Sequence, residues 1–273
     1  MSRDLKGKRV ILTGASGGMG QATARALAKA GARVVLAARS AEPLQALESE
    51  LRATGADVIA VPMDVTIPAD RERLLHTALE HFGGLDVLLN LSGIGSHGHF
   101  ATSTPEINRQ VMETNFFAPV ELMRLAIPHL TNGNQPAILN VSSMTGRRGV
   151  PAWPEYSASK WALVGISEAL RGELSRFGID VLQVLPGLTN SGFDKKLLRK
   201  DGRMVIRFDK GMTPEYVGGA IVRALETNER ETVLGREAKM LLRFNKFLPR
   251  LTSFLMARAV RKQYSKPDPN LAN

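Results

Sequence analysis

The sequence predicts a single α/β domain built on a doubly wound parallel sheet. Apolar, strand-like runs alternate with helical stretches along most of its 273 residues, which is the pattern of parallel sheets covered by helices. No linker is long or polar enough to separate two domains. Apolar residues make up 44% of the chain and aromatic residues only 5%, which indicates a globular protein with an aliphatic core.

Cysteine usage and hydrophobic runs limit the classes of function. The chain has no cysteine, so disulfides, thiolate nucleophiles and cysteine-ligated metals are excluded. No secretory leader precedes the first apolar run, Val10-Ile11-Leu12, and we expect a cytoplasmic protein. No run of about 20 apolar residues is present, so no membrane-spanning helix is expected.

The first strand, 8–13, leads into the turn Thr13-Gly14-Ala15-Ser16-Gly17-Gly18-Met19-Gly20, and a helix then runs to about residue 30. Glycines at 14, 18 and 20 allow a tight turn and a close approach of backbone to a pyrophosphate. The free N–H groups at the helix start favour its negative charge. Strand, turn and helix together favour a Rossmann-type dinucleotide site over a plain turn.

The second strand, 33–38, ends at Ala38-Arg39, where a carboxylate would bind the ribose 2′-hydroxyl of NAD. Arg39 instead suits a 2′-phosphate and predicts NADP(H); an exposed loop arginine is the alternative. A helix over 42–54 and a strand over 57–62 follow, and that strand is followed by Asp64-Val65. Asp64 either meets the adenine edge or caps the helix that begins near Ala69.

The fourth strand, 86–91, places Asn90 and Gly93 at a carboxyl end, where ligands of open parallel sheets bind. His97 and His99 follow without a carboxylate or thiol partner in their loop, so we expect no metal site. A long helix over 105–130 carries Asn115 near its middle. Asparagine is unfavourable inside a helix unless its side chain has another role, and a buried, fully hydrogen-bonded Asn115 is the structural alternative.

The fifth strand, 137–141, leads to Ser142-Ser143-Met144. A serine-hydrolase triad is disfavoured, because the chain has no G-x-S-x-G elbow and no histidine after His129. We expect a hydrogen-bonding serine instead. The remaining elements are a helix over 155–177, a strand over 179–185 ending at Pro186-Gly187, a possible lid over 188–211, a helix over 214–227 and a strand over 231–234.

Helix 155–177 carries Tyr156 and Lys160, which share one face because they are four residues apart. A free phenol has a pKa of about 10, roughly three units too high for a good proton shuttle. One cation at ~5 Å, at an effective dielectric of about 20, supplies ~3 kcal/mol toward lowering it. A Tyr-x-x-x-Lys pair alone is common on helix surfaces, so the surrounding motifs decide its meaning.

Together these motifs resemble those of the short-chain dehydrogenase/reductase family over about residues 10–235. The matching positions, in the order and spacing of that family, are Thr13-Gly14-x-x-x-Gly18-x-Gly20, Asp64, Asn90-x-x-Gly93, Asn115, Ser143, Tyr156-x-x-x-Lys160 and Pro186-Gly187. Two positions depart: Leu91-Ser92 replaces the usual Asn-Ala, and Thr189 lies closer to Pro186-Gly187 than is common.

The resemblance implies the catalytic roles. Tyr156 protonates the substrate carbonyl oxygen and Ser143 orients that oxygen. Lys160 binds the nicotinamide ribose and lowers the Tyr156 pKa, while Asn115 holds a water that connects Lys160 to solvent. The implied cofactor-binding residues are Gly14, Ser16, Gly18, Met19, Gly20, Arg39, Asp64, Val65, Asn90, Gly93, Tyr156, Lys160, Pro186, Gly187 and Thr189.

We therefore expect an NADP(H)-dependent oxidoreductase that acts on an apolar ketone or secondary alcohol, such as a lipid, steroid or acyl compound, and forms a homodimer or homotetramer. One alternative is a 3-oxoacyl reductase whose acidic carrier protein docks on Lys195, Lys196, Arg199 and Lys200. An alternative of another class is a non-catalytic dinucleotide-sensing or membrane-associated binding protein.

The C-terminal segment, 236–273, is strongly basic. Nine Lys or Arg and one Glu between Arg236 and Lys266 give +8; with Asp268 counted, only +3 of the total +10 is left for residues 1–235. An apolar stripe is expected at Leu241, Phe244, Leu248, Leu251 and Leu255, with Pro249 dividing the segment into two helices. A peripheral membrane contact through 236–266, a pocket lid and a subunit interface all fit. No nucleic-acid motif accompanies the charge, so no such partner is expected.

Overall fold

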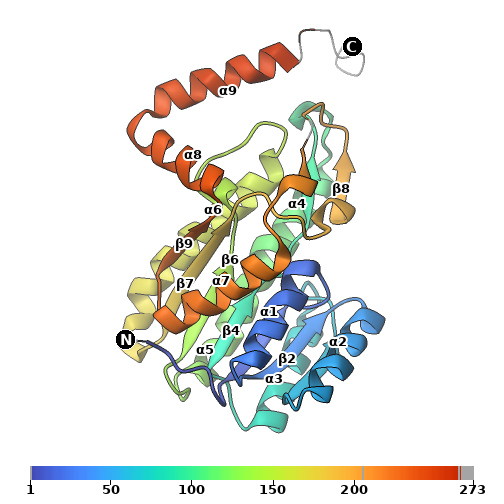
Figure 1. The fold of residues 1–273 in the computed structure, drawn as a ribbon, viewed down its shortest axis with the longest axis vertical. Helices are drawn as coiled ribbons and strands as arrows, with labels where there is room; N and C mark the ends of the chain where they lie inside the picture. The colour runs from blue at the N-terminus through green and yellow to red at the C-terminus, as the bar shows by residue number, and fades with distance from the viewer. Residues whose placement is uncertain (1, 205, 264, 266–273) are drawn as a thin grey trace.

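The computed structural model describes residues 2–204, 206–263 and 265. Seven parallel strands form one sheet in the order β3-β2-β1-β4-β6-β7-β9 (Figure 1), which confirms the predicted doubly wound fold. The bounds of these strands are β1 Arg9–Thr13, β2 Arg33–Ala38, β3 Val58–Pro62, β4 Val87–Asn90, β6 Ala137–Val141, β7 Asp180–Pro186 and β9 Glu231–Leu234.

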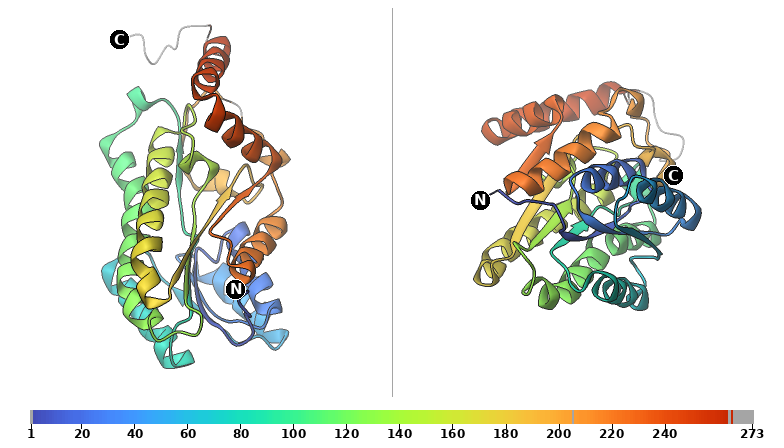
Figure 2. Two further views of the ribbon diagram at one scale, coloured as in Figure 1. Left: turned by 90° about the vertical axis from the view of Figure 1, so that its left-hand side faces the viewer. Right: turned by 60° about the horizontal axis from the view of Figure 1, so that its bottom comes forward.

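Helices cover both faces of the sheet (Figure 2). On one face α1 (Gly18–Lys29), α2 (Ala41–Ala53) and α7 (Pro214–Thr227) enclose an aliphatic core. On the other face lie α3 (Pro68–Phe82) and α5 (Ala118–Leu130), with part of α6 (Pro154–Glu173). Successive strand residues alternate between the two cores, because side chains of a strand point to opposite faces. This explains why the strands appear in the sequence as continuous apolar runs.

The helix expected over 105–130 is not one continuous α-helix. It consists of α4 (Pro105–Met112), a π-helical turn over Glu113–Phe117, and α5. Asn115 lies inside the π turn, fully buried, with both side-chain amide atoms bonded across to the Ile94 backbone. These long-range hydrogen bonds stabilise the wider π turn. Local helix propensity does not predict them. The next helix, α6, ends at Glu173 rather than 177, with a short 3₁₀ turn before Gly178.

The segment over 188–211 contains a strand that the sequence reading did not expect. This strand, β8 (Leu197–Lys200), pairs in parallel with β5 (Gly95–His97), which lies in the loop after β4. His97, the last residue of β5, is buried, and its ring is tilted by 45° against the Trp153 ring with the centroids 5.1 Å apart. Burial lowers the pKa of His97. The segment is thereby anchored beside the carboxyl end of the sheet, and its movement as a lid stays a prediction.

After β9 the chain forms α8 (Arg236–Phe247) and α9 (Pro249–Gln263), with the expected corner at Pro249. Residues 264 and 266–273 of the predicted 236–273 segment lie outside the described part, and its status as a separate unit stays a prediction. Of the predicted stripe, Leu241 and Phe244 are half-buried and Leu248, Leu251 and Leu255 are exposed, and its role stays a prediction. In the described residues, no helix is both long and apolar enough to cross a membrane.

Two adjacent glycines of α7 allow a matched test of its packing on α1. A Cβ on Gly218 would lie 2.7 Å from the backbone of Ala22 and Thr23, whereas a Cβ on Gly219 would meet nothing within 4 Å. Gly218→Ala should therefore destabilise the fold by about 1–3 kcal/mol through overpacking. Gly219→Ala should stabilise it by about 0.5–1 kcal/mol through helix propensity. Thermal denaturation of both variants checks this; shifts of equal sign would contradict the packing seen here.

Candidate active site

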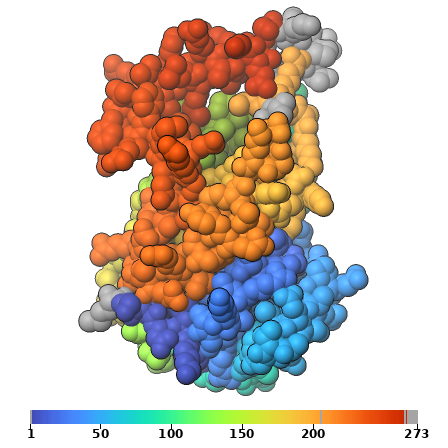
Figure 3. Space-filling view, viewed as in Figure 1, coloured from blue at the N-terminus to red at the C-terminus, as the bar shows by residue number. Residues whose placement is uncertain are grey.

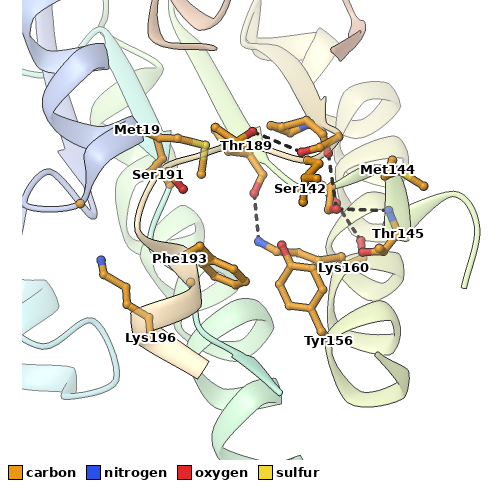
Figure 4. A pocket seen from close by; sticks show the side chains of 18 of the residues that line it. Met19, Ser142, Met144, Thr145, Tyr156, Lys160, Thr189, Ser191, Phe193 and Lys196 are labelled. Atoms are coloured by element: carbon orange, nitrogen blue, oxygen red, sulfur yellow. Dashed lines mark hydrogen bonds between the residues drawn. The ribbon is translucent and has the colours of Figure 1, made fainter. Parts of the chain in front are cut away.

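A cavity of ≈ 280 Å³ opens at the carboxyl ends of the central strands, between the glycine-rich turn and α6 (Figure 4). The expected site residues that line it are Gly14, Gly18, Met19, Gly20, Gly93, Ser143, Tyr156, Lys160, Pro186, Gly187 and Thr189. Those that do not line it are Ser16, Arg39, Asp64, Val65, Asn90 and Asn115. The structure thus brings together residues from the glycine turn, the ends of β4, β6 and β7, and the start of α6.

The glycine-rich turn lines one wall of the cavity, and its glycines are sterically required. Gly14 has φ 74°, and a Cβ there would lie 2.9 Å from the Ser92 nitrogen. A Cβ on Gly20 would lie 2.1 Å from the Gly14 oxygen. Helix α1 begins at Gly18, so the backbone N–H groups of its first turn, which have no partner within the helix, lie at this wall. A bare backbone at a helix start is the kind of cradle that a dinucleotide pyrophosphate fits.

Tyr156 and Ser143 lie on the opposite wall. The Ser143 hydroxyl lies beside the Tyr156 phenol and donates a long hydrogen bond to the Pro186 carbonyl oxygen at 3.5 Å. The Ser143 hydroxyl also accepts from the Thr145 N–H at 3.2 Å, which fixes its position. Ser142, by contrast, donates its hydroxyl to the Lys160 carbonyl oxygen at 3.1 Å. Ser143 is therefore the serine available to a ligand beside Tyr156.

The pKa of Tyr156 does not follow the expected direction. Burial raises it to about 12, and the hydrogen bond from Ser143 only partly opposes this. Lys160 Nζ lies 5.8 Å from the Tyr156 ring centroid and donates to the Val141 carbonyl oxygen at 3.0 Å. Burial lowers the Lys160 pKa to about 8. In the cofactor-free protein, removal from water outweighs any lowering of the phenol pKa by the ammonium.

Asn115 is buried behind the cavity rather than in its wall. Its Nδ2 donates to the Ile94 carbonyl oxygen at 2.9 Å and to Ser159 Oγ at 3.0 Å, while Oδ1 accepts from the Ile94 N–H. Gly93 lies next to both Asn115 Oδ1 and Lys160 Nζ. The described contacts match the structural alternative of a satisfied core asparagine. A water held by Asn115 stays a prediction.

Arg39 and Asp64 lie together at the ends of β2 and β3. Arg39 Nη1 is 4.0 Å from Asp64 Oδ2, and its side chain is 60% exposed, so it is available to a ligand. Asp64 accepts from the N–H and hydroxyl of Thr66. It does not cap α3, whose N-cap is Ile67, so that alternative is wrong. A contact of Asp64 with adenine stays a prediction.

Comparison with known proteins decides the family. Residues 8–202 match the family model described as short chain dehydrogenase. The chain belongs to the short-chain dehydrogenase/reductase family. It is 34% identical to the uncharacterized oxidoreductase YxnA of Bacillus subtilis, over 93% of this chain and 72% of that protein. It is 35% identical to the ketoacyl reductase HetN of Nostoc, over 85% of this chain and 80% of that protein.

Two solved structures share the fold and carry cofactors. A short-chain dehydrogenase from Burkholderia cenocepacia in complex with NADP has a TM-score of 0.76 and 25% identity, covering 97% of this chain and 100% of its own. A 3-ketoacyl-(acyl-carrier-protein) reductase from Brucella melitensis complexed with NADH has the same TM-score and identity, covering 84% and 97%. These relatives support a nicotinamide dinucleotide cofactor without deciding between NAD and NADP. Short-chain dehydrogenases act on small molecules and are commonly oligomers; a homodimer or homotetramer stays a prediction here.

Among the cavity residues that sequence reasoning did not place in the site, three come from the segment over 188–211 and lie close to expected site residues. Ser191 lies against Gly18, Lys196 Nζ lies against Gly17, and Phe193 lies between Lys196 and Tyr156 (Figure 4). The Phe193 ring is 5.5 Å from the Tyr156 ring. Partial burial and then the Arg39 charge lower the pKa of Lys196. The only sequence signal for these residues was the basic character of the segment. It suggested a docking surface for a carrier protein and not a wall of the cavity.

The four residues expected to dock a carrier protein, Lys195, Lys196, Arg199 and Lys200, have different surroundings, and docking on them stays a prediction. Lys196 turns to the glycine turn, and the Arg199 side chain is 9% exposed and paired with Asp201. Lys195, Lys196 and Lys200 are exposed, whereas Arg199 is half-buried. Within the described residues, no group of three or more His, Asp or Glu side chains is placed to hold a metal ion.

Proposed function

We propose that this chain is an NADP(H)-dependent oxidoreductase that transfers a hydride between the nicotinamide and an apolar ketone or secondary alcohol. The single observation that carries the proposal is the placement of Tyr156 and Ser143 side by side, with Lys160 Nζ 5.8 Å from the Tyr156 ring centroid, facing the glycine turn across one cavity. Two hydrogen-bonding hydroxyls beside a cofactor cradle are the groups that a carbonyl reduction needs.

The nicotinamide would supply or accept the hydride. In the reductive direction the Tyr156 O–H donates its proton to the substrate carbonyl oxygen, and the Ser143 hydroxyl donates a hydrogen bond to the same oxygen. Lys160 is a buried cation held by the Val141 carbonyl oxygen, and it stabilises the phenolate left after proton transfer. A raised pKa keeps Tyr156 protonated at neutral pH, which suits a proton donor.

An apolar substrate is favoured by the rest of the cavity wall. Beside Tyr156 the wall is formed by aromatic and aliphatic side chains: Met144, Val150, Trp153, Leu188, Phe193, Ile206 and Phe208. Among the residues that the structure describes, no acidic side chain lines it. Lys196, at the glycine turn, is the cation besides Lys160 that lines this cavity among the described residues. Apart from Lys160, which is held by the Val141 carbonyl oxygen, the described side chains beside Tyr156 are uncharged, which favours ketones and alcohols with aliphatic or aromatic groups.

Preference for NADP(H) is assigned to Arg39. A charge-assisted contact to phosphate is worth about 1.5–3 kcal/mol, so Arg39→Ala should lower kcat/KM with NADPH roughly tenfold to a hundredfold and change NADH little. Lys196→Ala should weaken the binding of both NADPH and NADH. The Lys196 amino group lies at the glycine turn, which is expected to hold the pyrophosphate that the two cofactors share. Lys195→Ala, on the exposed neighbour, is the control. Better turnover of NADH than NADPH by the wild type would reject the Arg39 assignment.

A second candidate is reduction of a 3-oxoacyl thioester, which is supported by the similarity to the ketoacyl reductase HetN and to the 3-ketoacyl-(acyl-carrier-protein) reductase of Brucella. Cofactor oxidation with a panel of apolar ketones and with 3-oxoacyl pantetheine thioesters separates the two candidates. Turnover of the thioesters alone would favour the acyl reductase. No turnover by either set, together with tight cofactor binding, would favour the dinucleotide-sensing or membrane-associated binding protein.

A further inference from the structure

Helices α8 and α9 expose an unusual number of large apolar side chains. Met240 and Phe247 are 67% and 71% exposed on α8, and Leu251, Phe254 and Leu255 are 42%, 56% and 47% exposed on α9. Residues 251, 254 and 255 share one helix face by their spacing, as do 240 and 247. Side chains of this size cost free energy in water, so their grouping on two consecutive helices indicates a binding surface.

The same two helices carry a concentrated positive charge. Within 236–263 the described residues include eight Lys or Arg and one Glu, a net charge of +7, and all eight basic side chains are exposed. Among the salt bridges of the described residues, none involves these eight. Their charge is therefore uncompensated by the protein and available to an anionic partner.

Helix α9 is hydrogen-bonded to two segments that each lead into a residue of the cavity wall. Arg148, which lies two residues before the cavity residue Val150, donates to Ser253 Oγ at 2.9 Å and contacts Met256. At the other end Gln263 donates to the Arg203 carbonyl oxygen at 2.8 Å, three residues before the cavity residue Ile206. In Figures 1 and 3, α8 and α9 form the end of the molecule farthest from α1 and α2.

We propose that the outer face of α8 and α9 docks on the surface of an anionic lipid bilayer. Apolar side chains enter the headgroup boundary while the flanking basic residues contact lipid phosphates, which is the arrangement of interfacial helices. A second copy of this chain fits less well, because pairing this face with itself would place +7 beside +7. Docking would set the segments of Arg148 and Arg203, which lead into the cavity wall, close to the lipid layer.

Flotation of the full-length protein with vesicles tests the docking. Binding to phosphatidylserine-containing vesicles should exceed binding to neutral phosphatidylcholine vesicles and fall as salt rises. Each basic residue near an anionic surface contributes about fivefold in partitioning, so Lys239→Gln, Arg243→Gln and Lys246→Gln together should weaken it about a hundredfold. The matched control removes three exposed charges at the other end of the molecule: Lys6→Gln, Lys29→Gln and Arg223→Gln.

The cysteine-free chain allows a direct test of apolar insertion. Phe254→Cys carrying an environment-sensitive dye should shift to the blue with anionic vesicles, and Lys29→Cys carrying the same dye should not. Full-length protein that stays unbound at low salt would overturn the proposal. The proposal would also be overturned if the protein bound no vesicles and instead formed a dimer that Phe247→Ser and Phe254→Ser dissociate. Binding to duplex DNA that these two substitutions do not change would overturn it as well. The vesicle experiments are run without cofactor or substrate. A failure to bind vesicles is therefore distinguishable from a failure of the proposed oxidoreductase activity.

Discussion

Tyr156→Phe should lower kcat by about 10²- to 10⁴-fold while leaving cofactor binding almost unchanged. The substitution removes the one O–H that faces both Ser143 and the cavity, yet the phenyl ring keeps its packing against Trp153 and Phe193. Initial rates of cofactor oxidation give kcat. Quenching of the fluorescence of Trp153, which lines the cavity, measures cofactor binding independently of turnover.

Tyr216→Phe is the matched control, because Tyr216 is 57% exposed on α7, away from the cavity. Its kcat should equal that of the wild type. An ultraviolet titration of the cofactor-free protein, with the Tyr156→Phe trace subtracted, should also show a phenol that ionises near the pKa of about 12 set by burial. Near wild-type turnover in Tyr156→Phe would remove Tyr156 from the role of proton donor.

Lys160→Met should abolish activity and at the same time stabilise the protein at pH 7. Burial lowers the Lys160 pKa from 10.5 to about 8, so holding the ammonium in the folded state costs about 3 kcal/mol when both states are protonated. Loss of the hydrogen bond to the Val141 carbonyl oxygen offsets about 1 kcal/mol of the gain. The net stabilisation of about 2 kcal/mol should raise Tm by roughly 4–8 °C for a chain of this size.

The stabilisation should depend on pH in a defined direction. Between about pH 8 and 10.5 the folded wild type releases the Lys160 proton before the unfolded chain does, so wild-type stability rises with pH and the advantage of Lys160→Met shrinks. Thermal melts at a series of pH values measure this, with Lys29→Met on the exposed end of α1 as control. A Lys160→Met variant that is less stable than the wild type at pH 7 would show that burial is not the dominant cost of this ammonium.

Several features followed from the sequence by itself, because local spacing determines them. Alternating strands and helices fixed the sheet and its carboxyl-end site. The structural role of the glycines at 14 and 20 could be predicted, because only a residue without Cβ fits a turn folded against its own backbone. Tyr156 and Lys160 share one cavity because a helix repeats every 3.6 residues. The break at Pro249 followed from its missing N–H.

Other features were decided only by tertiary structure, because they depend on contacts between segments far apart in the chain. The π turn around Asn115 exists beside the Ile94 backbone, 21 residues away, and no local propensity encodes that pairing. Phe193 and Lys196 enter the cavity because β8 pairs with β5, about 100 residues earlier. The direction of the Tyr156 pKa is set by how completely Trp153, Phe193 and the surrounding fold exclude water. Spacing places a charge near a phenol, but only the packed structure determines whether desolvation outweighs that charge.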